Sequence, residues 1–583
     1  MNRSFVHTFF TFFVLLFLAQ CKSKQELPTG DPGNGGLFLP GDFEALVVAD
    51  SVGPARHIAV NDNGDIYVKL RYSKPGMGGN LALRDSTGDG KVDIIKRFGD
   101  YNNQGSLSNA MRIHNGYLYF ASELVIYRNK LTPGKLVPES KMEVVLTDDH
   151  PHGSHWHITK PISFDNNGNL YVPFGTPSNS CQDLDNKPAG IPGVPGRDPC
   201  PELEQHGGIW KFDASKIGLT QKDGKRFATG IRSVVAMDWN PDDKNLYVVM
   251  HGRDDLHLLW PEKFSPWQSA VLPAEEFQRV KEGDDFGWPY CYYDQIQKKK
   301  VLAPEYGGDG KIIGRCKDCR DPVLGFPGHW APNDLLFYRG NQFPAHYKNG
   351  AFIAFHGSTN RGPYPQSGYF VCFVPFKNGE PDGEWEVFAD GFAGTDTIVN
   401  TSDADYRPMG LAVGPDGSLY VTDSRKGKIW RIMYKGDPNK FGAAQLEQIE
   451  KRKLLSHIKT PDEINDNLDR NKPVAGTKVY DIYCRACHQR DGKGDGLRFP
   501  PLDSSEWVTG DKKRLINILL NGLQGTIKVR DKPFNSLMPP QNFLKDEEIA
   551  QVLTYIRQNF NNEASAVTPG EVTEARKSQK SKN

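Results

Sequence analysis

Short apolar runs separated by polar turns extend along most of the chain. In each unit an apolar run leads into a turn of Asn, Asp or Gly, and a second apolar run containing Leu-Tyr or Ile-Tyr follows. Runs of this composition form strands, and such turns join strands into hairpins. Five full units and one degenerate unit are HIAVNDNGDIYV (57–68), MRIHNGYLYF (111–120), ISFDNNGNLYV (162–172), MDWNPDDKNLYVV (237–249), LAVGPDGSLYVTD (411–423) and GAFIAFHG (350–357).

The spacing of the units predicts how the hairpins are arranged. Tyr67, Tyr119 and Tyr171 lie 52 residues apart, which is close to the period of known propeller blades. About six copies predict a mainly β fold, a six-bladed β-propeller over residues 43–435. Two longer intervals hold the loop between Cys181 and Cys200 and the Trp/Tyr-rich segment 286–340, and inserts of this kind usually lie on the functional face.

The pattern changes after the propeller. Residues 436–472 are charged and poor in β-branched residues, as expected for a linker with some helix. Residues 473–561 are predicted to form a small all-α domain, whose last helix carries apolar residues at helical spacing. These residues are Ile549, Val552, Leu553, Ile556 and Phe560. The polar tail 562–583 is predicted to be disordered.

The helical domain contains the motif CxxCH at residues 484–488. Cys484 and Cys487 can bond covalently to haem c, and the adjacent His488 can bind its iron. Met538, in SLMPP before the last helix, is the expected sixth ligand, with water or a second His as the alternative. The stretches VYDIYCRACHQRDGKGDG (479–496) and MPPQNFLKDEEIAQVLTYI (538–556) resemble class I cytochrome c domains.

The first 21 residues are predicted to be an export signal. Arg3 precedes an apolar run from Phe9 to Ala19 that is too short for a membrane span. The run ends in Leu-Ala-Gln-Cys, which resembles a bacterial lipobox, although Gln20 stands where that pattern prefers a small residue. We expect a periplasmic or outer-membrane lipoprotein, held to the membrane through Cys21 and the tether 22–42. An ordinary signal peptide with a chance cysteine is the alternative.

Export implies an oxidising compartment, where the remaining cysteines can form disulfides. Cys181 and Cys200 flank a Gly/Pro-rich loop and can close it. One further pair is expected within a cluster of three, with zinc as the alternative: Cys291, Cys316 and Cys319. Cys372 is predicted to be a buried free thiol. Lys plus Arg and Asp plus Glu each number 71, so no net charge or basic stripe suggests a nucleic-acid partner.

Several stretches in the propeller region, taken together and in order, resemble the glucose/sorbosone dehydrogenase family, whose members are six-bladed propellers that bind pyrroloquinoline quinone (PQQ) and calcium. These stretches are HITKPISFDNNGNLYVPFGT (157–176), GIRSVVAMDWNPDDKNLYVVMHGRDDL (230–256), GDDFGWPYCYYD (283–294), FPGHWAPNDLLFYRGNQFP (326–344), FIAFHGSTNR (352–361) and YRPMGLAVGPDGSLYVTDS (406–424).

The resemblance implies a role for individual residues. His157 falls where the family has its catalytic base, which takes the hydroxyl proton of a sugar while hydride leaves for the quinone. PQQ carries three carboxylates, and the cations that match the family's pattern are Arg232, Arg407 and the weaker Arg361. His329 lines the pocket. The backbone carbonyls of Gly252 and Arg253 would bind calcium, with Asp254 and Asp255 adding negative charge.

Two positions depart from the glucose-type branch of that family. Cys181 stands where glucose dehydrogenases place a pocket glutamine, and Met409 stands where they carry a second arginine. The chain therefore resembles the sorbosone-type branch more closely, and the sugar remains open.

Two further patterns contain metal-ligand residue types. His152, His155 and His157 are close in sequence, as either a metal site or a polar loop. The acidic loop from Asp85 through Asp89 to Asp93 resembles calcium-binding loops but lacks the EF-hand glutamate, so a plain acidic turn is the alternative.

The sequence as a whole predicts an exported quinohaemoprotein that oxidises a sugar, aldose or aldehyde with PQQ and Ca²⁺ and passes the electrons to its own haem c. A downstream cytochrome or respiratory chain would then accept them. The competing hypothesis is a cofactor-free propeller that binds glycans or a protein and carries an electron-transfer tail. A hydrolytic lactonase propeller would leave the haem motif unexplained.

Overall fold

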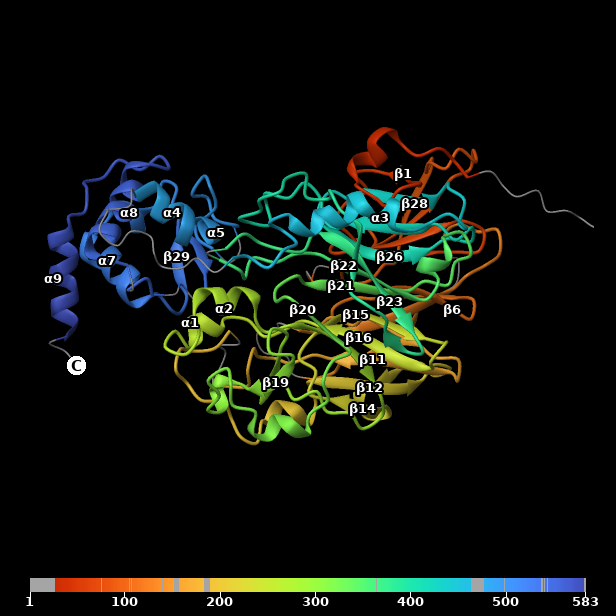
Figure 1. Ribbon diagram of the computed structural model, residues 1–583, viewed down its shortest axis with the longest axis horizontal. Helices are drawn as coiled ribbons and strands as arrows, with labels where there is room; N and C mark the ends of the chain where they lie inside the picture. The colour runs from red at the N-terminus through yellow and green to blue at the C-terminus, as the bar shows by residue number, and fades with distance from the viewer. Residues whose placement is uncertain are drawn as a thin grey trace, which may run out of the picture.

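The computed structural model describes residues 27–580, apart from positions 75, 104, 106, 139–140, 151–156, 183–188, 363, 463–475, 497–498, 536–537, 539 and 543. Within this part of the chain, six sheets form the blades of a β-propeller, and a small helical domain follows (Figure 1); their strands pair antiparallel except for the short outermost strand of blade 2. The six-bladed fold predicted from the repeat spacing is confirmed.

The first three blades follow the chain in order. Each begins with the hairpin of one sequence unit and adds two or three outer strands. Blade 1 comprises β2 (Ala55–Val60), β3 (Ile66–Leu70), β4 (Asn80–Arg84) and β5 (Ile94–Phe98); blade 2, β6 (Met111–His114), β7 (Tyr117–Ala121), β8 (Val125–Lys130), β9 (Glu143–Thr147) and β13 (Leu219–Thr220); blade 3, β10 (Ser163–Phe164), β11 (Asn169–Phe174), β12 (Gly208–Asp213) and β14 (Lys225–Thr229).

The last three blades repeat this plan, and the degenerate unit at 350–357 supplies an inner strand of blade 5. Blade 4 comprises β15 (Val234–Asn240), β16 (Asn245–Met250), β17 (Glu275–Val280) and β20 (Leu324–Phe326); blade 5, β21 (Pro332–Phe337), β22 (Gly350–Phe355), β23 (Phe370–Lys377), β24 (Glu380–Pro381) and β25 (Glu386–Ala389); blade 6, β26 (Pro408–Val413), β27 (Leu419–Asp423), β28 (Ile429–Tyr434) and β1 (Phe43–Ala49).

Blade 6 closes the ring because its outer strand comes from the start of the propeller sequence. β1 pairs antiparallel with β28 in a register that joins Phe43 to Tyr434 and Val47 to Trp430. The rings of Phe43 and Trp430 belong to one buried cluster that spans blades 5 and 6. Apolar side chains fill the spaces between blades, and the repeat tyrosines at positions 67, 119, 171 and 247 are buried there.

Segments on either side of the ring pack against it more closely than the sequence predicts. The described part of the tether, residues 27–42, contributes the buried Leu37 and a backbone bridge from Phe38 to Asp390. The linker forms α3 (Ala443–Glu450), and its Ile449 and Ile458 are buried in the core cluster of blades 4 and 5. Apolar side chains within these polar segments find burial on the ring, so neither described part is a loose connection.

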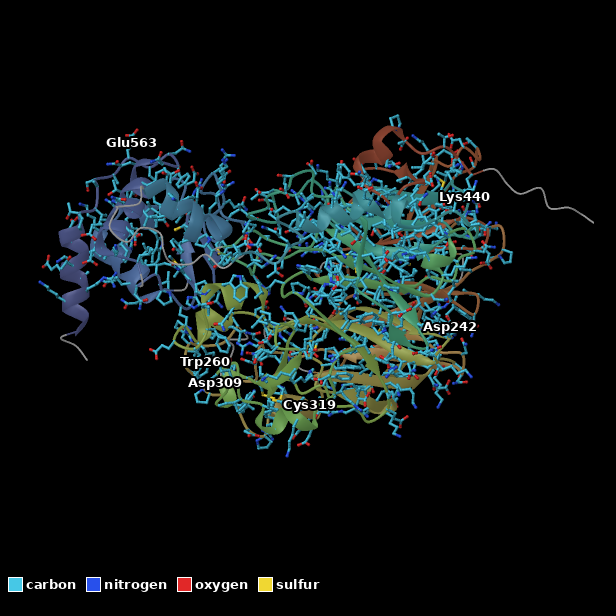
Figure 2. All side chains as sticks on the ribbon, viewed as in Figure 1. Asp242, Trp260, Asp309, Cys319, Lys440 and Glu563 are labelled. Atoms are coloured by element: carbon cyan, nitrogen blue, oxygen red, sulfur yellow. A yellow bond between two sulfur atoms is a disulfide. The ribbon has the colours of Figure 1, made fainter. Side chains whose placement is uncertain are left out.

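Two disulfides brace the inserts. Cys181 pairs with Cys200, and Cys291 pairs with Cys316, as the sequence predicts for one pair in each region. Cys319 is a free thiol in the second insert, labelled in Figure 2, and Cys372 is free and buried in β23. The insert around the second disulfide contains the hairpin β18 (Cys291–Asp294) and β19 (Lys299–Leu302), and α1 (Leu256–Leu259) and α2 (Pro266–Val271) lie between β16 and β17.

The C-terminal domain is built on helices around one apolar core. Its elements are α4 (Gly476–Tyr483), α5 (Arg485–His488), α6 (Glu506–Thr509), α7 (Lys512–Asn521), β29 (Ile527–Val529), β30 (Lys532–Phe534), α8 (Asp546–Gln558) and α9 (Pro569–Lys580). The prediction of a disordered tail is wrong for its described part, residues 562–580, because α9 packs on α7 and α8. Val567 and Val572 are buried in the domain core, and Arg576 pairs with Asp546.

Candidate functional site

The residues predicted to contact PQQ and its calcium lie at one end of the ring, where each blade's inner hairpin is open, whereas the loop from Asp85 to Asp93 joins β4 and β5 at the opposite end. Arg407 precedes β26, and it lies beside the end of β27 because Pro408 pairs with Asp423. In the same way Arg232 precedes β15, next to the residues that follow β16, because Val234 pairs with Met250. His157 enters blade 3 ahead of β10, close enough to Arg232, Asp254 and His251 of blade 4 for their charges to act on it.

His157 is buried and held by backbone. Its Nδ1 lies 2.8 Å from the carbonyl oxygen of Thr176 and 3.1 Å from that residue's Oγ1. A carbonyl oxygen only accepts, so Nδ1 carries the proton and Nε2 carries the lone pair. Burial, aided by the charge of Arg232, lowers the pKa of His157 well below its usual value. The imidazole is therefore neutral at pH 7 and able to act as a base.

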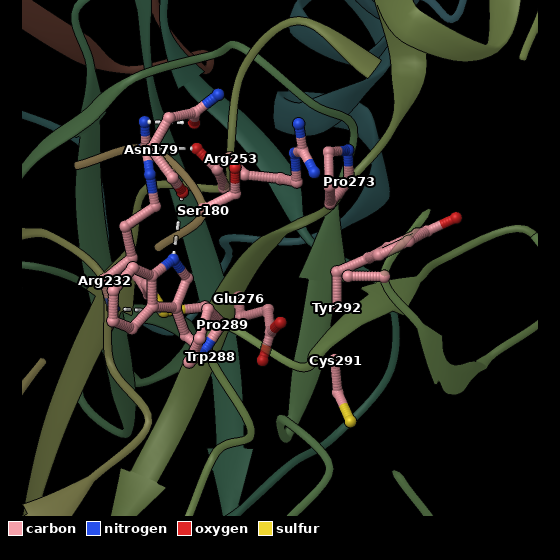
Figure 3. A pocket seen from close by; sticks show the side chains of 13 residues that line it. Asn179, Ser180, Arg232, Arg253, Pro273, Glu276, Trp288, Pro289, Cys291 and Tyr292 are labelled. Carbon is pink, nitrogen blue, oxygen red and sulfur yellow. Dashed lines mark hydrogen bonds between the residues drawn. The ribbon is translucent and has the colours of Figure 1, made fainter. Parts of the chain in front are cut away.

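Arg232 connects His157 to the acidic loop that follows β16. Its guanidinium donates to Gly252 O at 2.7 Å, Asn179 Oδ1 at 2.9 Å and Asp254 Oδ2 at 3.0 Å. Trp288 supports Asn179 by donating its indole N–H to the Asn179 carbonyl, as Figure 3 shows. Arg232 Nε is buried without a hydrogen-bond partner among the described residues.

Asp254 is the acidic centre of this group. Burial alone would raise its pKa, but Arg232 and His329 together lower it, so the carboxylate is ionised. His329 Nδ1 lies 3.4 Å from Asp254 Oδ1, and Asn360 donates to the same oxygen at 2.6 Å. Burial and the neighbouring Asp254 charge raise the pKa of Asp255 to about 6. Residues of blades 4 and 5 thus meet at one carboxylate.

Arg407 stands on the opposite side of this group, in a cluster of cations. Its guanidinium donates to His356 O at 3.0 Å, to His356 Nδ1 at 2.8 Å and to Gly357 O. Burial, together with the charges of Arg71 and Arg407, lowers the pKa of Arg56 to about 9. Arg56 Nε is buried and lacks a hydrogen-bond partner among the described residues. Three cations, Arg56, Arg71 and Arg407, therefore lie close together here.

Arg361 is fully buried and lies behind the same region. Its Nε donates to Ala270 O of α2 at 3.0 Å, while Nη1 and Nη2 have no hydrogen-bond partner in the part of the chain that the structure describes. Burial lowers its pKa to about 9. Tyr369 lies between it and Arg407, whose guanidinium carbon is 5.8 Å from the ring centroid.

Arg253 and Gly252 occupy the position predicted for calcium. The Arg253 side chain is buried against Glu305, which accepts from its Nη1, and its Nε and Nη2 both donate to the backbone carbonyl of Asp254 at 3.2 Å. The Gly252 carbonyl accepts from Arg232, so a calcium ion at this oxygen would share it with a guanidinium hydrogen bond. A cavity of about 10 Å³, the size of one water molecule, lies beside Arg232, Gly252 and Cys291 (Figure 3).

The acidic loop of blade 1 uses its carboxylates within the loop. Asp85 accepts from the backbone N–H groups of Thr87, Gly88 and Gly90, and Asp93 accepts from Ser86. Among the described residues no group of three or more His, Cys, Asp or Glu side chains is placed to hold a metal ion. The calcium predicted for Asp85, Asp89 and Asp93 stays a prediction. His152 and His155 lie outside the described residues.

The haem motif spans the junction of α4 and α5. His488 is 8% exposed, and its Nδ1 donates to the Pro500 carbonyl at 3.0 Å, which directs the proton-free Nε2 to the opposite side. A histidine oriented in this way is suited to bind iron. Cys484 and Cys487 are not disulfide-bonded. Met538 packs at the edge of the domain core, and its backbone pairs with Leu523; its role as the sixth ligand stays a prediction.

Sequence reasoning missed Arg56, Arg71 and His356. A signal was present, because Arg56 lies at the start of its sequence unit just as Arg232 and Arg407 precede theirs. Two departures from the glucose-type pattern also have a structural place. Cys181 forms a disulfide with Cys200, and the Sδ atom of the buried Met409 lies 3.2 Å from Asn333 Nδ2.

Comparisons with known proteins cover both halves of the chain. Residues 38–435 match the family model described as TrAA12-like, and residues 473–560 match that of cytochrome c. Among solved structures, the PQQ domain of pyranose dehydrogenase from Coprinopsis cinerea has a TM-score of 0.53 at 18% identity, covering 68% of this chain and 97% of its own. At that identity the likeness shows the fold.

Two curated relatives match shorter stretches. Cytochrome c-552 of Thermus thermophilus is 44% identical over 85 residues, which cover 14% of this chain and 64% of that protein. An uncharacterised protein of Borreliella burgdorferi is 29% identical over 220 residues, which cover 37% of this chain and 51% of that protein. The chain thus spans between half and two thirds of the length of these relatives. No helix in the described part of the chain is long and apolar enough to cross a membrane.

Proposed function

The chain belongs to the TrAA12-like family, and from this premise we propose that it oxidises a sugar, aldose or related aldehyde with PQQ and delivers the electrons to its own haem c. One observation carries the proposal. Buried guanidinium N–H groups without hydrogen-bond partners among the described residues occur in the same chain as a neutral His157 and a CxxCH motif. An anionic cofactor would supply acceptors for these N–H groups.

The described residues fit the three carboxylates of PQQ. Arg56, Arg232 and Arg361 each hold buried N–H groups without partners, and leaving such groups unsatisfied costs about 1–3 kcal/mol apiece or more. Asp254 fixes Arg232 from one side, and His356 with Gly357 fixes Arg407 from the other. The clamp is therefore held in place before a ligand arrives, which lowers the entropic cost of binding.

His157 acts as the base in this proposal. Bound PQQ supplies the acceptor for the hydride that leaves the sugar carbon. The hydroxyl proton of that carbon goes to Nε2 of His157, while Thr176 keeps the opposite nitrogen protonated and the ring in position. Haem c, implied by the cytochrome c domain, supplies a one-electron outlet toward a downstream acceptor.

Calcium belongs to the proposal through Gly252, Arg253 and Asp254. Oxygen donors from a backbone carbonyl and an ionised carboxylate suit this hard cation. Gly252 O would hold the ion with one lone pair while the other accepts from Arg232. The loop from Asp85 to Asp93 is a second candidate for calcium.

The test uses the full chain with and without cofactor. Purified protein is loaded with PQQ and Ca²⁺, aldoses are added one at a time, and haem absorbance is followed. Sugar should reduce the haem in loaded protein alone. Reduction at the same rate without PQQ would overturn the proposal, and glycan binding without any reduction would favour the cofactor-free binding propeller.

We further propose that the protein is exported and anchored by a lipid on Cys21, on the strength of the N-terminal sequence alone. Cys21→Ser should then move the protein from the membrane fraction to the soluble fraction. A wild-type protein that is already soluble would rule the anchor out.

A further inference from the structure

The segment Glu450–Pro461, here called the strap, connects the propeller to the haem domain and is fixed in place. His457 is 2% exposed, and its Nε2 lies 2.9 Å from Asp390 Oδ1 at the end of β25. The carbonyl of His457 accepts from Gly368 N at 2.9 Å and Ser367 Oγ at 2.7 Å. Asp390 itself is fully buried.

Contacts along the rest of the strap reach other parts of the propeller. Arg452 forms an ion pair with Asp390, and Ser456 donates to Asp396 through both its N–H and its hydroxyl. At the far end, Trp267 of α2 donates its indole N–H to Pro461 O at 2.7 Å. The strap therefore leaves the propeller surface beside α2, at the side of the ring nearest the haem domain (Figure 1).

A second contact meets the haem domain itself. The loop Asn400–Asp403, here called the seat, is a tight turn in which Asp403 accepts from Asn400 N and Asn400 Oδ1 accepts from Ser402 N. Ser402 Oγ lies 3.1 Å from Oε1 of Gln489, the residue directly after His488. Tyr480 donates to the carbonyl of Gln489 at 2.7 Å and holds it at the end of α5.

The seat is connected to the cation cluster through one carboxylate. Asp423 Oδ1 accepts from the backbone N–H of Arg407 at 2.7 Å and from that of Arg425 at 3.0 Å. Arg425 in turn donates to Ser402 O at 3.1 Å. Four linked contacts thus lead from Arg407 to the residue beside the haem ligand.

We infer that the strap and the seat form the electron-exit surface of the propeller, and that its partner is the cytochrome c domain of the same chain, docked through its His488–Gln489 end. The inference rests on the proposed function. It assigns the cytochrome c domain a fixed position on the propeller, at the end of the ring where Arg407 lies. The alternative is a domain that diffuses freely on the linker 436–472.

The docked position is tested first without PQQ or sugar. Cysteines replace Ser402 and Gln489, and a short bis-thiol-reactive linker is added to the haem-loaded protein. Peptide mapping should find residues 402 and 489 joined within one chain. The matched control joins Ser402→Cys to Glu563→Cys, which lies on the haem domain at the junction of α8 and α9 and is labelled in Figure 2. Equal yields from both pairs would overturn the inference.

The second test removes the strap's buried anchor. His457→Ala should slow haem reduction by sugar on the order of tenfold or more, because small misplacements of reacting groups have effects of this size. Direct reduction of a two-electron dye by the propeller should change less than about twofold. The control is His346→Ala, which removes an exposed His–carboxylate pair on blade 5 and should alter neither rate.

Conservative variants keep this test informative if His457→Ala does not fold. Trp267→Phe removes the indole donor to Pro461, and Ser402→Ala removes the hydroxyl contacts to Gln489 and to Asn400 Oδ1 while keeping the backbone bond from Ser402 N to Asn400. Both should slow haem reduction while sparing the dye. Unchanged haem reduction in all these variants would overturn the docked position, whereas failure of wild-type protein to reduce dye or haem would count against the proposed function and leave the cross-link result to stand.

Discussion

His157, the proposed base, is oriented by a backbone oxygen. Because a carbonyl cannot take the proton from Nδ1, the tautomer does not depend on another side chain's ionisation. Arg232, which lowers the pKa of His157 by its charge, is itself balanced by Asp254. The imidazole ring of His157 is thus neutral, while the neighbouring side chains of Arg232 and Asp254 are charged.

Removal of this base should separate chemistry from cofactor binding. His157→Ala should lower kcat on the order of 10²–10⁴-fold, the usual contribution of a general base, while the affinity for PQQ stays close to that of wild type. Steady-state kinetics and PQQ titration check the two quantities. The control is His114→Ala. The ring of His114 in blade 2 stacks on Phe164 of blade 3. A His157 variant with full kcat would assign the base elsewhere.

The low pKa of His157 also predicts a pH profile. A base whose pKa lies well below 6.5 stays deprotonated through mildly acidic conditions, so kcat/KM should fall only below the usual histidine range. The test is to measure kcat/KM of the PQQ-loaded protein between about pH 4 and pH 8, in steps of about half a pH unit. An acid limb centred at or above pH 6.5 would contradict it.

At the scale of elements, the sequence predicts the hairpins well and the packing of polar segments poorly. A pair of strands can be predicted from two apolar runs on either side of an Asn/Asp/Gly turn, because this signal is local in the sequence. The burial of α9 and of the strap depends on surfaces made elsewhere in the chain, and the few apolar residues involved, such as Val572 and Ile458, lie among charged ones.

The tail helix α9 should contribute measurably to the stability of the haem domain. Val572 is fully buried against this domain's core, so Val572→Ala should lower the free energy of unfolding by about 1–3 kcal/mol. Thermal unfolding followed at the haem band checks it. Glu574→Ala, on the exposed side of the same helix, should have almost no effect, and an equal loss in both variants would contradict a stabilising role for the burial of Val572.

The pairing of cysteines shows a second limit at this scale. Sequence proximity places Cys291, Cys316 and Cys319 together but leaves three pairings open. The structure joins Cys291 to Cys316 and leaves Cys319 Sγ 3.8 Å from Cys291 Sγ. Which two cysteines pair depends on where each side chain points once the insert has folded. The spacing of the cysteines along the chain does not give this direction.

For the whole molecule, the repeats predict the ring, and the ring then explains the site. A sequence unit shows which residues precede each inner strand, but only closure of the ring brings Arg56 of blade 1 next to Arg407 of blade 6. The family resemblance supplies His157, Arg232 and Arg407 because their motifs are local. His356 and Arg71 escape it, since their place follows from the ring alone.

The position of the haem domain should respond to pH through His457. Burial lowers the pKa of His457, but Asp390 and Asp396 raise it further, so the net pKa lies above the usual value. The charged ring, with Arg452 beside the same Asp390, contributes stability that is complete below about pH 6.5 and is lost as pH rises through the folded-state pKa.

Thermal unfolding of wild type and His457→Ala across this range provides the measurement. The stability difference between them should be largest in mild acid and shrink toward alkaline pH. His346→Ala again serves as the control for an exposed His–carboxylate pair. A difference that grows with pH would mean that His457 is neutral in the folded protein.

The closure of the ring by β1 and β28 has a consequence for synthesis. Phe43 leaves the ribosome nearly four hundred residues before its partner Tyr434, so the largest single loop of the propeller closes last. Contacts of such long range make folding slow and expose unpaired strand edges meanwhile. Until blade 6 is complete, Arg56 of blade 1 and Arg407 of blade 6 are not brought together. The proposed cofactor site therefore forms only after Tyr434 has been synthesised, which sets the order in which assembly proceeds.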